Sequence, residues 1–450
     1  MTDRAVTAAF RFGFGLPLDP AAAAPEALLA GLSGPDRAAA TWPGVVTPEA
    51  LVLLQREIGL RETKKTDPDA AAVEARAIQR AGLILQRQGQ RATFARALGG
   101  AALRERLAWF WTNHFTVVPR GRNQLGWPSA LRDEAIRPHL AGPFAEMLKA
   151  VAIHPGMLFY LDQIGSFGPA SKRGKANGRG LNENYARELL ELHTLGVAAA
   201  YTQADVRELA ELLAGLTVRP ADGFFFDAAR AEPGAETVLG VEYGGRNTAP
   251  IFRLLEDLAR RPETAAHLAR KLAVHFVSDQ PDPALVEALA AEWRASGGDL
   301  RRVTEVLVTH PAALSGPAAK VRPPGEFMAA ALHALGVSGD EVYGMAEGPF
   351  QRLVIRPLAA MGQRWEAAPG PNGWPEAASA WVTPAGMAAR IEWAMQVPGR
   401  LVVPLPDPRD LARTALGARA DAELLGAVAA AESTREGAGL VFASPAFNRR

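Results

Sequence analysis

The residues best able to carry out chemistry are concentrated in one stretch, residues 181–197, which reads LNENYARELLELHTLGV. At about 100° per residue in an α-helix, its ionic and amide side chains fall on one side, and its leucines and tyrosine fall on the other. The polar set is Glu183, Asn184, Arg187, Glu188 and Glu191. The stretch is therefore predicted to form an amphipathic helix, and its polar side either meets water or lines a site.

Two interpretations of this polar side lead to different functions. In the first, the glutamates and Arg187 form a solvated ladder of i,i+4 pairs, each contributing a few tenths of a kcal/mol. In the second, the carboxylates are partly buried, Arg187 keeps some of them ionised, and Glu188 or Glu191 has a raised pKa and transfers protons. Asn184 and Asn113 then orient the ligand. A fully exposed Glu188 excludes the second interpretation.

A basic segment precedes this helix. The loop expected over residues 166–180 contains no acid and leads into Asn182, a good helix N-cap. Basic side chains beside a helix N-terminus can bind phosphate, sulfate or carboxylate groups. The candidate anion contacts are Lys172, Arg173, Lys175 and Arg179. The alternative is a flexible, solvated loop, and the spacing does not match a P-loop.

Three histidines are placed on the apolar faces of predicted helices. They are His114, His193 and His275. A single histidine on an apolar face is usually a hydrogen-bonded core residue. The functional alternative is that the three converge on a divalent metal ion, because neutral imidazole is a common metal ligand. The chain contains neither an HExxH nor an ExxH pair to support a metal site.

Tryptophans recur in the C-terminal part of the chain, near the Gly-Pro-Asn-Gly-Trp-Pro segment at 370–375. Exposed indole rings can stack on ligands, but aromatic residues more often fix irregular loops to a core. The residues concerned are Trp365, Trp374, Trp381 and Trp393.

Composition limits the class of protein. The 49 basic and 48 acidic residues give a net charge of +1, which argues against a general nucleic-acid binder. The absence of cysteine excludes disulfides, thiolate nucleophiles and cysteine-ligated metals. The N-terminus, MTDRAVTAAFRFGFGLPLDP, has no signal-like apolar core, and no run approaches the ~20 apolar residues of a membrane span. A soluble, cytoplasmic protein is expected.

The periodicity predicts a mainly α protein with a small β hairpin or meander around 216–243. A chain of 450 residues exceeds the usual size of a single core, so two packed helical subdomains are expected. The expected divisions are 1–215, a helical subdomain; 216–245, the β element; and 246–450, a second helical subdomain with an irregular end rich in Trp, Pro and Gly. A capping box is predicted from Thr202 to Asp205. The helices that carry His114, Glu188 and His275 are expected at the subdomain interface.

Motifs spread along nearly the whole chain resemble a bacterial family known as domain of unknown function 1800. They include WFWTNHF at 109–115, HPGMLFYLD at 154–162, NENYARELLELHTLGV at 182–197 and YTQADVRELAELLAGLTV at 201–218. Further matches are ETVLG at 236–240, TAAHLARKLAVHF at 264–276, KVRPPGEF at 320–327, GWP at 373–375 and the closing SPAFNRR.

This resemblance implies a mostly helical fold. It also implies a partner, because genes of this family are commonly found beside genes for a sulfatase-like family whose members carry export signals. Co-export with that partner is the alternative to a cytoplasmic location. The chain departs from the family pattern at Ala231, where a histidine is usual, at Glu236 in place of a lysine, and at Asp162-Gln163 in place of Asp-Asn.

The sequence leaves two functions open. The first is an enzyme of hydrolase or transferase type in which Glu188, Glu191, Arg187, Asn184 and Asn113 act on an anionic ligand. The second is a non-catalytic assembly or export partner of a sulfatase-like protein, in which the same polar face forms a protein interface.

Overall fold

The structure, a computed structural model, describes residues 3–15 and 20–450. Residues 1–2 and 16–19, which belong to the N-terminal stretch analysed for an export signal, lie outside the described residues. The predicted fold class is confirmed, because helices make up most of the chain and the strands form only two small antiparallel sheets. No helix in the described ranges is long and apolar enough to cross a membrane.

The helices follow one another with short connections. In the first part of the chain they are α1 (Asp3–Phe12), α2 (Pro25–Leu32), α3 (Arg37–Thr41), α4 (Thr47–Thr66), α5 (Pro68–Gly99), α6 (Ala102–His114), α7 (Trp127–Ala130), α8 (Phe144–Ile153) and α9 (Pro155–Tyr160). In the middle they are α10 (Lys172–Asn177), α11 (Asn184–Glu188), α12 (Gln203–Leu213), α13 (Ala249–Arg260), α14 (Pro262–Phe276), α15 (Pro283–Ser296), α16 (Leu300–Thr309) and α17 (Pro311–Leu314).

The C-terminal part is more regular than the sequence suggested. Its helices are α18 (Pro324–Ala334), α19 (Gly339–Gly344), α20 (Glu347–Phe350), α21 (Arg356–Ala360), α22 (Pro384–Gln396), α23 (Pro398–Leu401), α24 (Pro408–Leu416), α25 (Ala422–Ala429), α26 (Thr434–Ala443) and α27 (Pro445–Asn448). Short 3-10 turns are η1 (Pro20–Ala23), η2 (Arg122–Gln124), η4 (Arg137–His139), η5 (Gln163–Gly165), η8 (Ala378–Ala380) and η9 (Gly417–Arg419), and π-helical turns are η3 (Leu131–Ile136), η6 (Leu189–Thr194) and η7 (Gln351–Ile355).

The β element forms where it was predicted. Strand β1 (Leu216–Arg219) pairs with β2 (Gly223–Phe226) in antiparallel register, with Leu216 opposite Phe226. Strand β3 (Ala235–Val238) pairs with β4 (Val241–Gly244) in the same way. Gly223 has a φ of 83°, the left-handed conformation that lets the Pro220–Gly223 turn close. The capping box from Thr202 to Asp205 is also confirmed.

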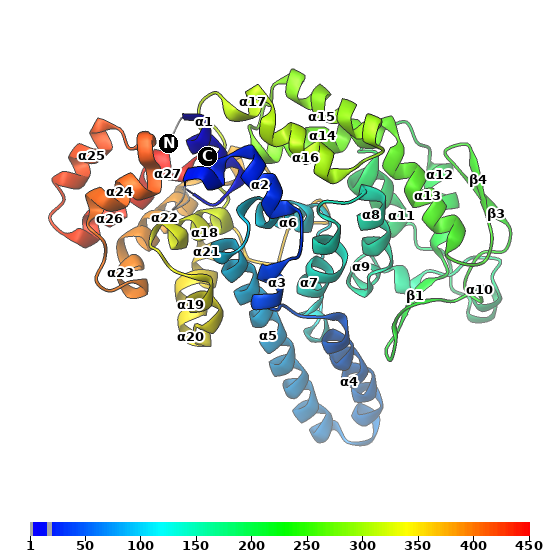
Figure 1. The fold of residues 1–450 in the computed structure, drawn as a ribbon. Helices are drawn as coiled ribbons and strands as arrows, with labels where there is room; N and C mark the ends of the chain where they lie inside the picture. Colours follow the sequence, from blue (N-terminus) through cyan, green and yellow to red (C-terminus); the bar gives the residue numbers. More distant parts are fainter. Residues whose placement is uncertain (1–2, 16–19) are drawn as a thin grey trace.

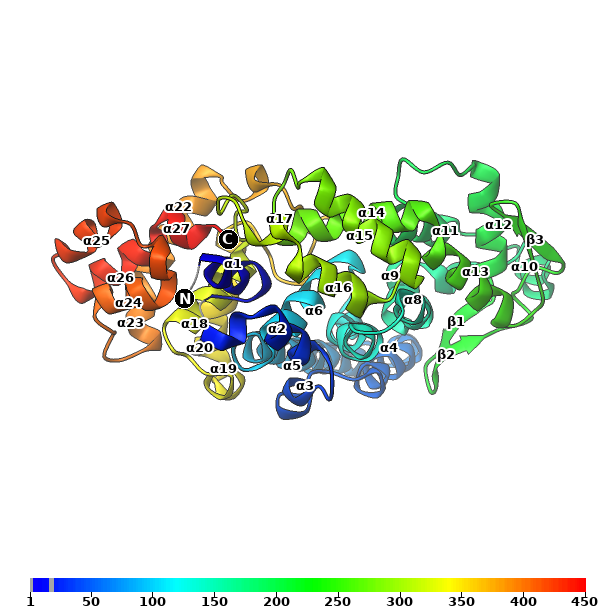
Figure 2. The same cartoon turned by 45° about the horizontal axis from the view of Figure 1, so that its top comes forward.

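Buried apolar residues gather in two main clusters. The first contains residues from α2, α4, α6, α8 and α11–α17, together with the β element. The second contains residues from α18 to α27, together with residues of α1 and α5. Figures 1 and 2 show an elongated molecule with the β element at one end and α23–α26 at the other. The division of the chain into two helical subdomains, 1–215 and 246–450, with the β element at 216–245 between them, stays a prediction.

The helical hairpin of α4 and α5 projects from this body (Figure 1). Its base is fixed by buried ion pairs between α5 and the first cluster. Both Asp133 oxygens accept hydrogen bonds from Arg96 on α5, at 2.6 and 3.0 Å, and Oδ1 also accepts one from Arg132 at 2.8 Å. Burial alone would raise the pKa of Asp133, but the two arginines lower it to about 2. The carboxylate therefore stays ionised and holds α5 in place.

Replacing Asp133 with Asn is predicted to destabilise the protein by about 3–5 kcal/mol at pH 7, because two buried arginines lose their counter-charge. The folded pKa of about 2 lies below the ordinary value of 3.8, so this contribution is present above pH 4 and is lost as the pH falls towards 2. Urea unfolding of both proteins should therefore show a gap in midpoint that narrows between pH 4 and pH 2.

The matched control is Asp410→Asn, in which an aspartate loses an exposed arginine partner, Arg413. This variant should unfold at nearly the wild-type midpoint. Equal effects of the two substitutions would contradict the role given to Asp133.

Candidate functional site

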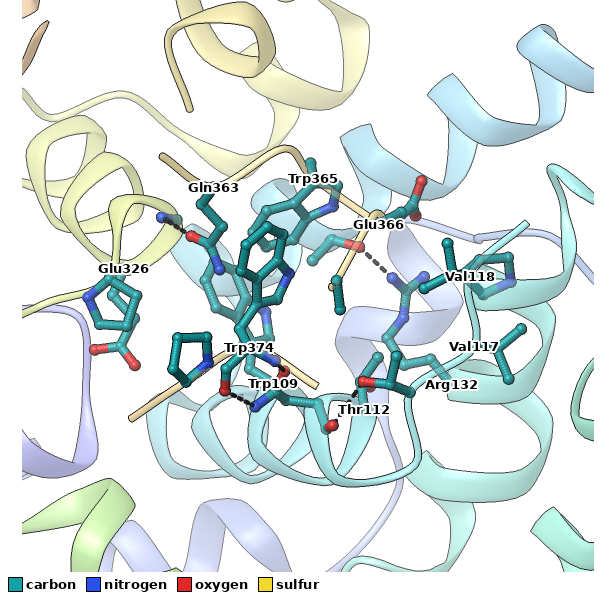
Figure 3. A pocket seen from close by; sticks show the side chains of 18 of the residues that line it. Trp109, Thr112, Val117, Val118, Arg132, Glu326, Gln363, Trp365, Glu366 and Trp374 are labelled. Carbon is teal, nitrogen blue, oxygen red and sulfur yellow. Dashed lines mark hydrogen bonds between the residues drawn. The ribbon is translucent and has the colours of Figure 1, made fainter. Parts of the chain in front are cut away.

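A cavity of about 130 Å³ lies where the two hydrophobic clusters meet. This volume suits a group about the size of a small ring. Helix α6, the segment from 116 to 132, the start of α18 and the loop between α21 and α22 enclose it. Its lining includes Trp109, Thr112, Asn113, Val117, Val118, Arg132, His275, Glu326, Gln363, Trp365, Glu366, Trp374 and Glu376. Figure 3 shows the tryptophans in the centre, with Glu326 and Glu366 on opposite sides of them.

Tryptophan rings form one wall of the cavity. The ring centroids of Trp109 and Trp365 are 5.2 Å apart at an interplanar angle of 64°, and Phe94 packs edge-on against Trp109. Trp365 occupies space that only a glycine leaves open, because a Cβ on Gly325 would overlap its ring. Such a wall offers apolar ring faces to a ligand.

The Gly373–Pro375 turn is fixed to the end of α6 by the side chain of Asn113. Asn113 Nδ2 donates to the carbonyl oxygen of Trp374 at 3.2 Å, and the Trp374 amide donates to Asn113 Oδ1 at 2.7 Å. Gly373 has a φ of 77°, and a Cβ there would overlap the Asn113 carbonyl oxygen. Asn113 therefore lines the cavity as predicted, but its amide positions Trp374.

Glu366 is the carboxylate with the weakest compensation in the cavity. It follows Trp365 in the irregular loop with a φ of 57°, an uncommon conformation for a residue other than glycine. Burial raises its pKa to about 7, and the opposing effects of Arg132 and of a hydrogen bond from Gln90 Nε2 at 3.1 Å are smaller. Arg132 donates instead to Asp133, Ser129 and Thr93. Glu366 therefore exchanges a proton near neutral pH.

Glu376 has the opposite environment. His275 Nδ1 lies 2.7 Å from its Oε1, and Lys320 Nζ lies 3.0 Å from its Oε2. Lys320 also contacts Asp279 at 2.7 Å. Burial would raise the pKa of Glu376, but His275 and Lys320 lower it well below its ordinary value. Because its side chain is 25% exposed and Pro375 is exposed, the cavity reaches the surface near this turn.

Glu326 is the third carboxylate of the lining. It forms ion pairs of 2.6 Å with Arg106 on α6 and with Arg450. His275 Nε2 lies 3.8 Å from Glu326 and 3.3 Å from Arg106 Nη2. Burial would raise the pKa of Glu326, but the two arginines lower it to about 2. The cavity thus contains two permanently ionised carboxylates and one, Glu366, that titrates near pH 7.

The acidic and arginine side of residues 183–191 is at a different place. Arg187 contacts Glu183 at 3.4 Å and Glu191 at 3.6 Å, with side chains 38%, 35% and 22% exposed. Burial, and then the charge of Glu191, raise the pKa of half-buried Glu188, so the exposure test does not exclude it. Asn184 is exposed. None of these residues lines the cavity, and their catalytic role stays a prediction.

The basic segment forms a short helix, α10, where a loop was expected, because Ser171 caps it by accepting from the Gly174 amide at 3.0 Å. Its candidate anion contacts are exposed, and they are Lys172, Arg173, Lys175 and Arg179. Arg173 lies 3.2 Å from Asp227, and Arg179 lies over the ring of Phe167. Two of the four cations therefore already have protein partners.

The three histidines are buried as predicted, but they have different partners. His275 lines the cavity, whereas His114 Nε2 lies 3.3 Å from the carbonyl oxygen of His193 and His114 Nδ1 lies 3.0 Å from Lys271 Nζ. Burial lowers the pKa of His193 to about 3 and that of Lys271 to about 8. Over residues 3–15 and 20–450, no group of three or more His, Asp or Glu side chains is arranged to hold a metal ion.

Sequence reasoning missed most of the residues that line the cavity. Glu326 and Trp374 lie in the segments KVRPPGEF and GWP, which carried the family resemblance, and Trp365 and Trp374 were already candidates from the tryptophan set. Lys320 and Arg450, the ion-pair partners of Glu376 and Glu326, lie in KVRPPGEF and SPAFNRR. Their convergence was not visible from spacing, because these segments are far apart in the chain. Glu366 lies outside those segments, in an irregular loop, and no sequence signal marked it.

The raised pKa of Glu366 can be tested by the pH dependence of the protein's stability. Its folded pKa of about 7 lies above the ordinary 4.5, so the folded state binds the proton more tightly and stability falls as the pH rises from 4.5 to 7. Glu366→Gln should match the wild type at pH 5 and be more stable at pH 8.5, by up to about 3 kcal/mol. Urea midpoints at both pH values measure this.

Glu326→Gln is the control with the opposite sign, because its partners hold the folded pKa at about 2. It should be less stable than the wild type at pH 8.5. A Glu366 carboxyl that titrates near 4.5 by NMR would contradict the assignment.

Gly373→Ala is predicted to displace Trp374 from the cavity, because the new Cβ overlaps Asn113 and the φ of 77° is strained for alanine. The expected cost is about 1–3 kcal/mol of stability, with a shift in tryptophan fluorescence. Gly370→Ala in the same loop is the control, since its Cβ would meet only the Asn372 side chain at 3.0 Å. Equal melting temperatures and spectra for both variants would refute the packing argument.

Comparison with known proteins gives a family and no characterised relative. No curated protein and no solved structure matches the chain. The sequence model of the family described as "Protein of unknown function (DUF1800)" matches residues 9–449, which confirms the resemblance carried by the motifs. The chain therefore belongs to the DUF1800 family.

Proposed function

We propose that this protein is an acid/base enzyme of hydrolase or transferase type, and that its reaction takes place in the cavity between the two hydrophobic clusters. The observation that carries the proposal is Glu366, a partly buried residue whose carboxyl lines the cavity and has a pKa raised to about 7. Carboxylates whose environments separate their pKa values are typical of acid/base sites.

In this proposal Glu366 is the general acid. In its protonated form it donates a proton to the leaving oxygen or nitrogen of the substrate as the bond to that atom breaks. The new bond forms to the oxygen of an attacking water molecule or acceptor hydroxyl, and the proton that this oxygen loses returns to Glu366. Glu326 and Glu376 stay ionised because their cationic and histidine partners neutralise them, so neither carboxylate competes with the substrate for the proton of Glu366. Trp109, Trp365 and Trp374 bind the apolar part of the substrate.

The lining favours an uncharged substrate group. Three of its residues are glutamates, and its arginine, Arg132, already donates to protein oxygens. Ion pairs already neutralise Glu326 and Glu376, so an anionic group would find no unpaired arginine among the described lining residues. The small volume, about 130 Å³, suits a single ring or a short acyl group at the reacting position. The sequence predicted an anionic ligand. If such a ligand binds, we propose that it binds outside this cavity.

The experiment incubates the wild type, Glu366→Gln and Glu188→Gln with a panel of glycosides, esters, amides and their acceptors, and detects products by mass spectrometry. We expect turnover by the wild type that decreases as the pH rises through 7, because Glu366 loses its proton. A general acid contributes about 10²- to 10⁴-fold, so Glu366→Gln should lose at least about 100-fold in kcat/KM. Glu392→Gln, on the exposed face of α22, is the preparation control.

Loss of activity in Glu188→Gln with retention in Glu366→Gln would move the reaction to the helix of residues 183–191. If the wild type and the variants bind these compounds but none of them forms a product, the proposal of an enzyme is contradicted. That result would favour the second candidate, an assembly partner of a sulfatase-like protein. The part of the molecule most accessible to such a partner is the projecting α4–α5 hairpin, which exposes Val52, Ile58, Val73 and Ile84. A cytoplasmic location and co-export with such a partner likewise remain proposals.

A further inference from the structure

A second, larger cavity lies beside α1 and α27. Its volume is about 700 Å³, within the range of small-molecule sites. Helix α1, the segment after α17, η9 and α27 enclose it, and α1, α17 and α27 lie together in both overall views (Figures 1 and 2). Its lining is Arg4, Val6, Thr7, Leu314, Ser315, Gly316, Ala318, Ala418, Arg419, Pro445, Ala446 and Arg449.

The charge of this lining has one sign. Arg4, Arg419 and Arg449 carry positive charge, and none of the lining residues that the structure describes is acidic. Arg4 and Arg449 are exposed, and Arg419 is partly buried. The guanidinium of Arg419 lies 4.0 Å from the centroid of the Phe10 ring, and its buried Nη1 has no hydrogen-bond partner among the described residues.

The protein interior behind the cavity is also rich in arginine. Arg322 lies over Phe10, at 5.0 Å from its centroid, and Arg11 donates to the carbonyl oxygens of Ala313 and Ser315. Burial and then the charges of Arg419 and Arg450 lower the pKa of Arg11 to about 10. Glu326 neutralises Arg450 and also acts on Arg322, whereas Arg419 lies close enough to Arg11 to lower its pKa. A negative charge beside Arg419 and Arg11 is therefore stabilised.

The remaining lining is apolar or carries hydroxyl groups. Val6, Leu314, Ala318, Ala418, Pro445 and Ala446 provide an apolar surface, and Thr7 and Ser315 provide hydroxyl donors. A bare inorganic ion would leave that surface and most of the 700 Å³ unused. An amphiphilic ligand fits both parts of the lining.

We infer that this second cavity binds a small organic anion, a molecule with an apolar body and a phosphate, sulfate or carboxylate group. Arg419 contacts the anionic group together with Arg4 and Arg449, because guanidinium forms paired hydrogen bonds with such oxygens. The apolar body lies against α1 and α27. The site is separate from the tryptophan-lined cavity, and it does not depend on the reaction proposed there.

Isothermal titration calorimetry of the full chain at constant ionic strength tests this inference. Phenyl phosphate, benzoate and inorganic phosphate are the anionic probes, and phenol is the uncharged control. We expect saturable binding of phenyl phosphate or benzoate, at least about tenfold tighter than that of inorganic phosphate, and none of phenol. The comparison of phenyl phosphate with benzoate distinguishes a phosphate site from a carboxylate site.

Arg419→Gln should weaken the binding at least about tenfold, since one charged hydrogen-bonding group is lost. Arg419→Lys should weaken it less, and Arg449→Gln, at an exposed position, provides the test if Arg419 variants do not fold. The double variant Lys64→Gln, Lys65→Gln removes the same charge from the exposed end of α4, outside both candidate anion sites, and should bind as the wild type does. Three results would overturn the inference: no saturable binding of any anion, unchanged binding in both Arg419→Gln and Arg449→Gln, or loss of binding in the α4 variant.

Discussion

The rest of the structure depends on the neutralisation of one buried carboxylate, Glu326. It lies on α18, which packs in the C-terminal cluster, and its partners Arg106 and His275 lie on α6 and α14 of the first cluster. Arg450 closes the group from the end of the described chain. A buried ion without its counter-ions costs several kcal/mol, so these helices can associate only in an arrangement that brings the charges together. The position of the cavity follows, because it lies directly beside this contact.

The need to neutralise buried charge also explains why the carboxylates of the cavity differ in pKa. Glu326 and Glu376 are each held by two cationic or histidine partners, so their ionised forms are stabilised in the interior. Glu366 receives a hydrogen bond from an amide, Gln90, while the nearby Arg132 is committed to Asp133. Three glutamate side chains of the same chemistry therefore differ in pKa, because they differ in the partners that the surrounding segments supply. Burial with little compensation is the reason that the pKa of Glu366 is raised to about 7.

Much of the fold was predictable because local patterns determine it. The Thr202–Asp205 capping box predicted the start of α12, and the change of periodicity predicted a small β element around 216–243. The inward position of the three histidines followed from helical periodicity. The helix from Asn184 is different, because it continues as a π-helical turn over Leu189–Thr194, and a constant 100° per residue does not describe it.

The sequence by itself determined the helices, the small β element, the exclusion of cysteine chemistry and the family. Only the tertiary structure decided which polar residues meet. Asn113, His275, Trp365 and Trp374 were candidates and do line the cavity. Glu366 and Glu376 were not candidates, because they come from an irregular loop whose path no periodicity describes. Proton affinity depends on burial and on partners more than a hundred residues away, such as Gln90 for Glu366 and His275 for Glu376. A linear pattern records residue types and local spacing, whereas these distances exist only after the two clusters have packed together.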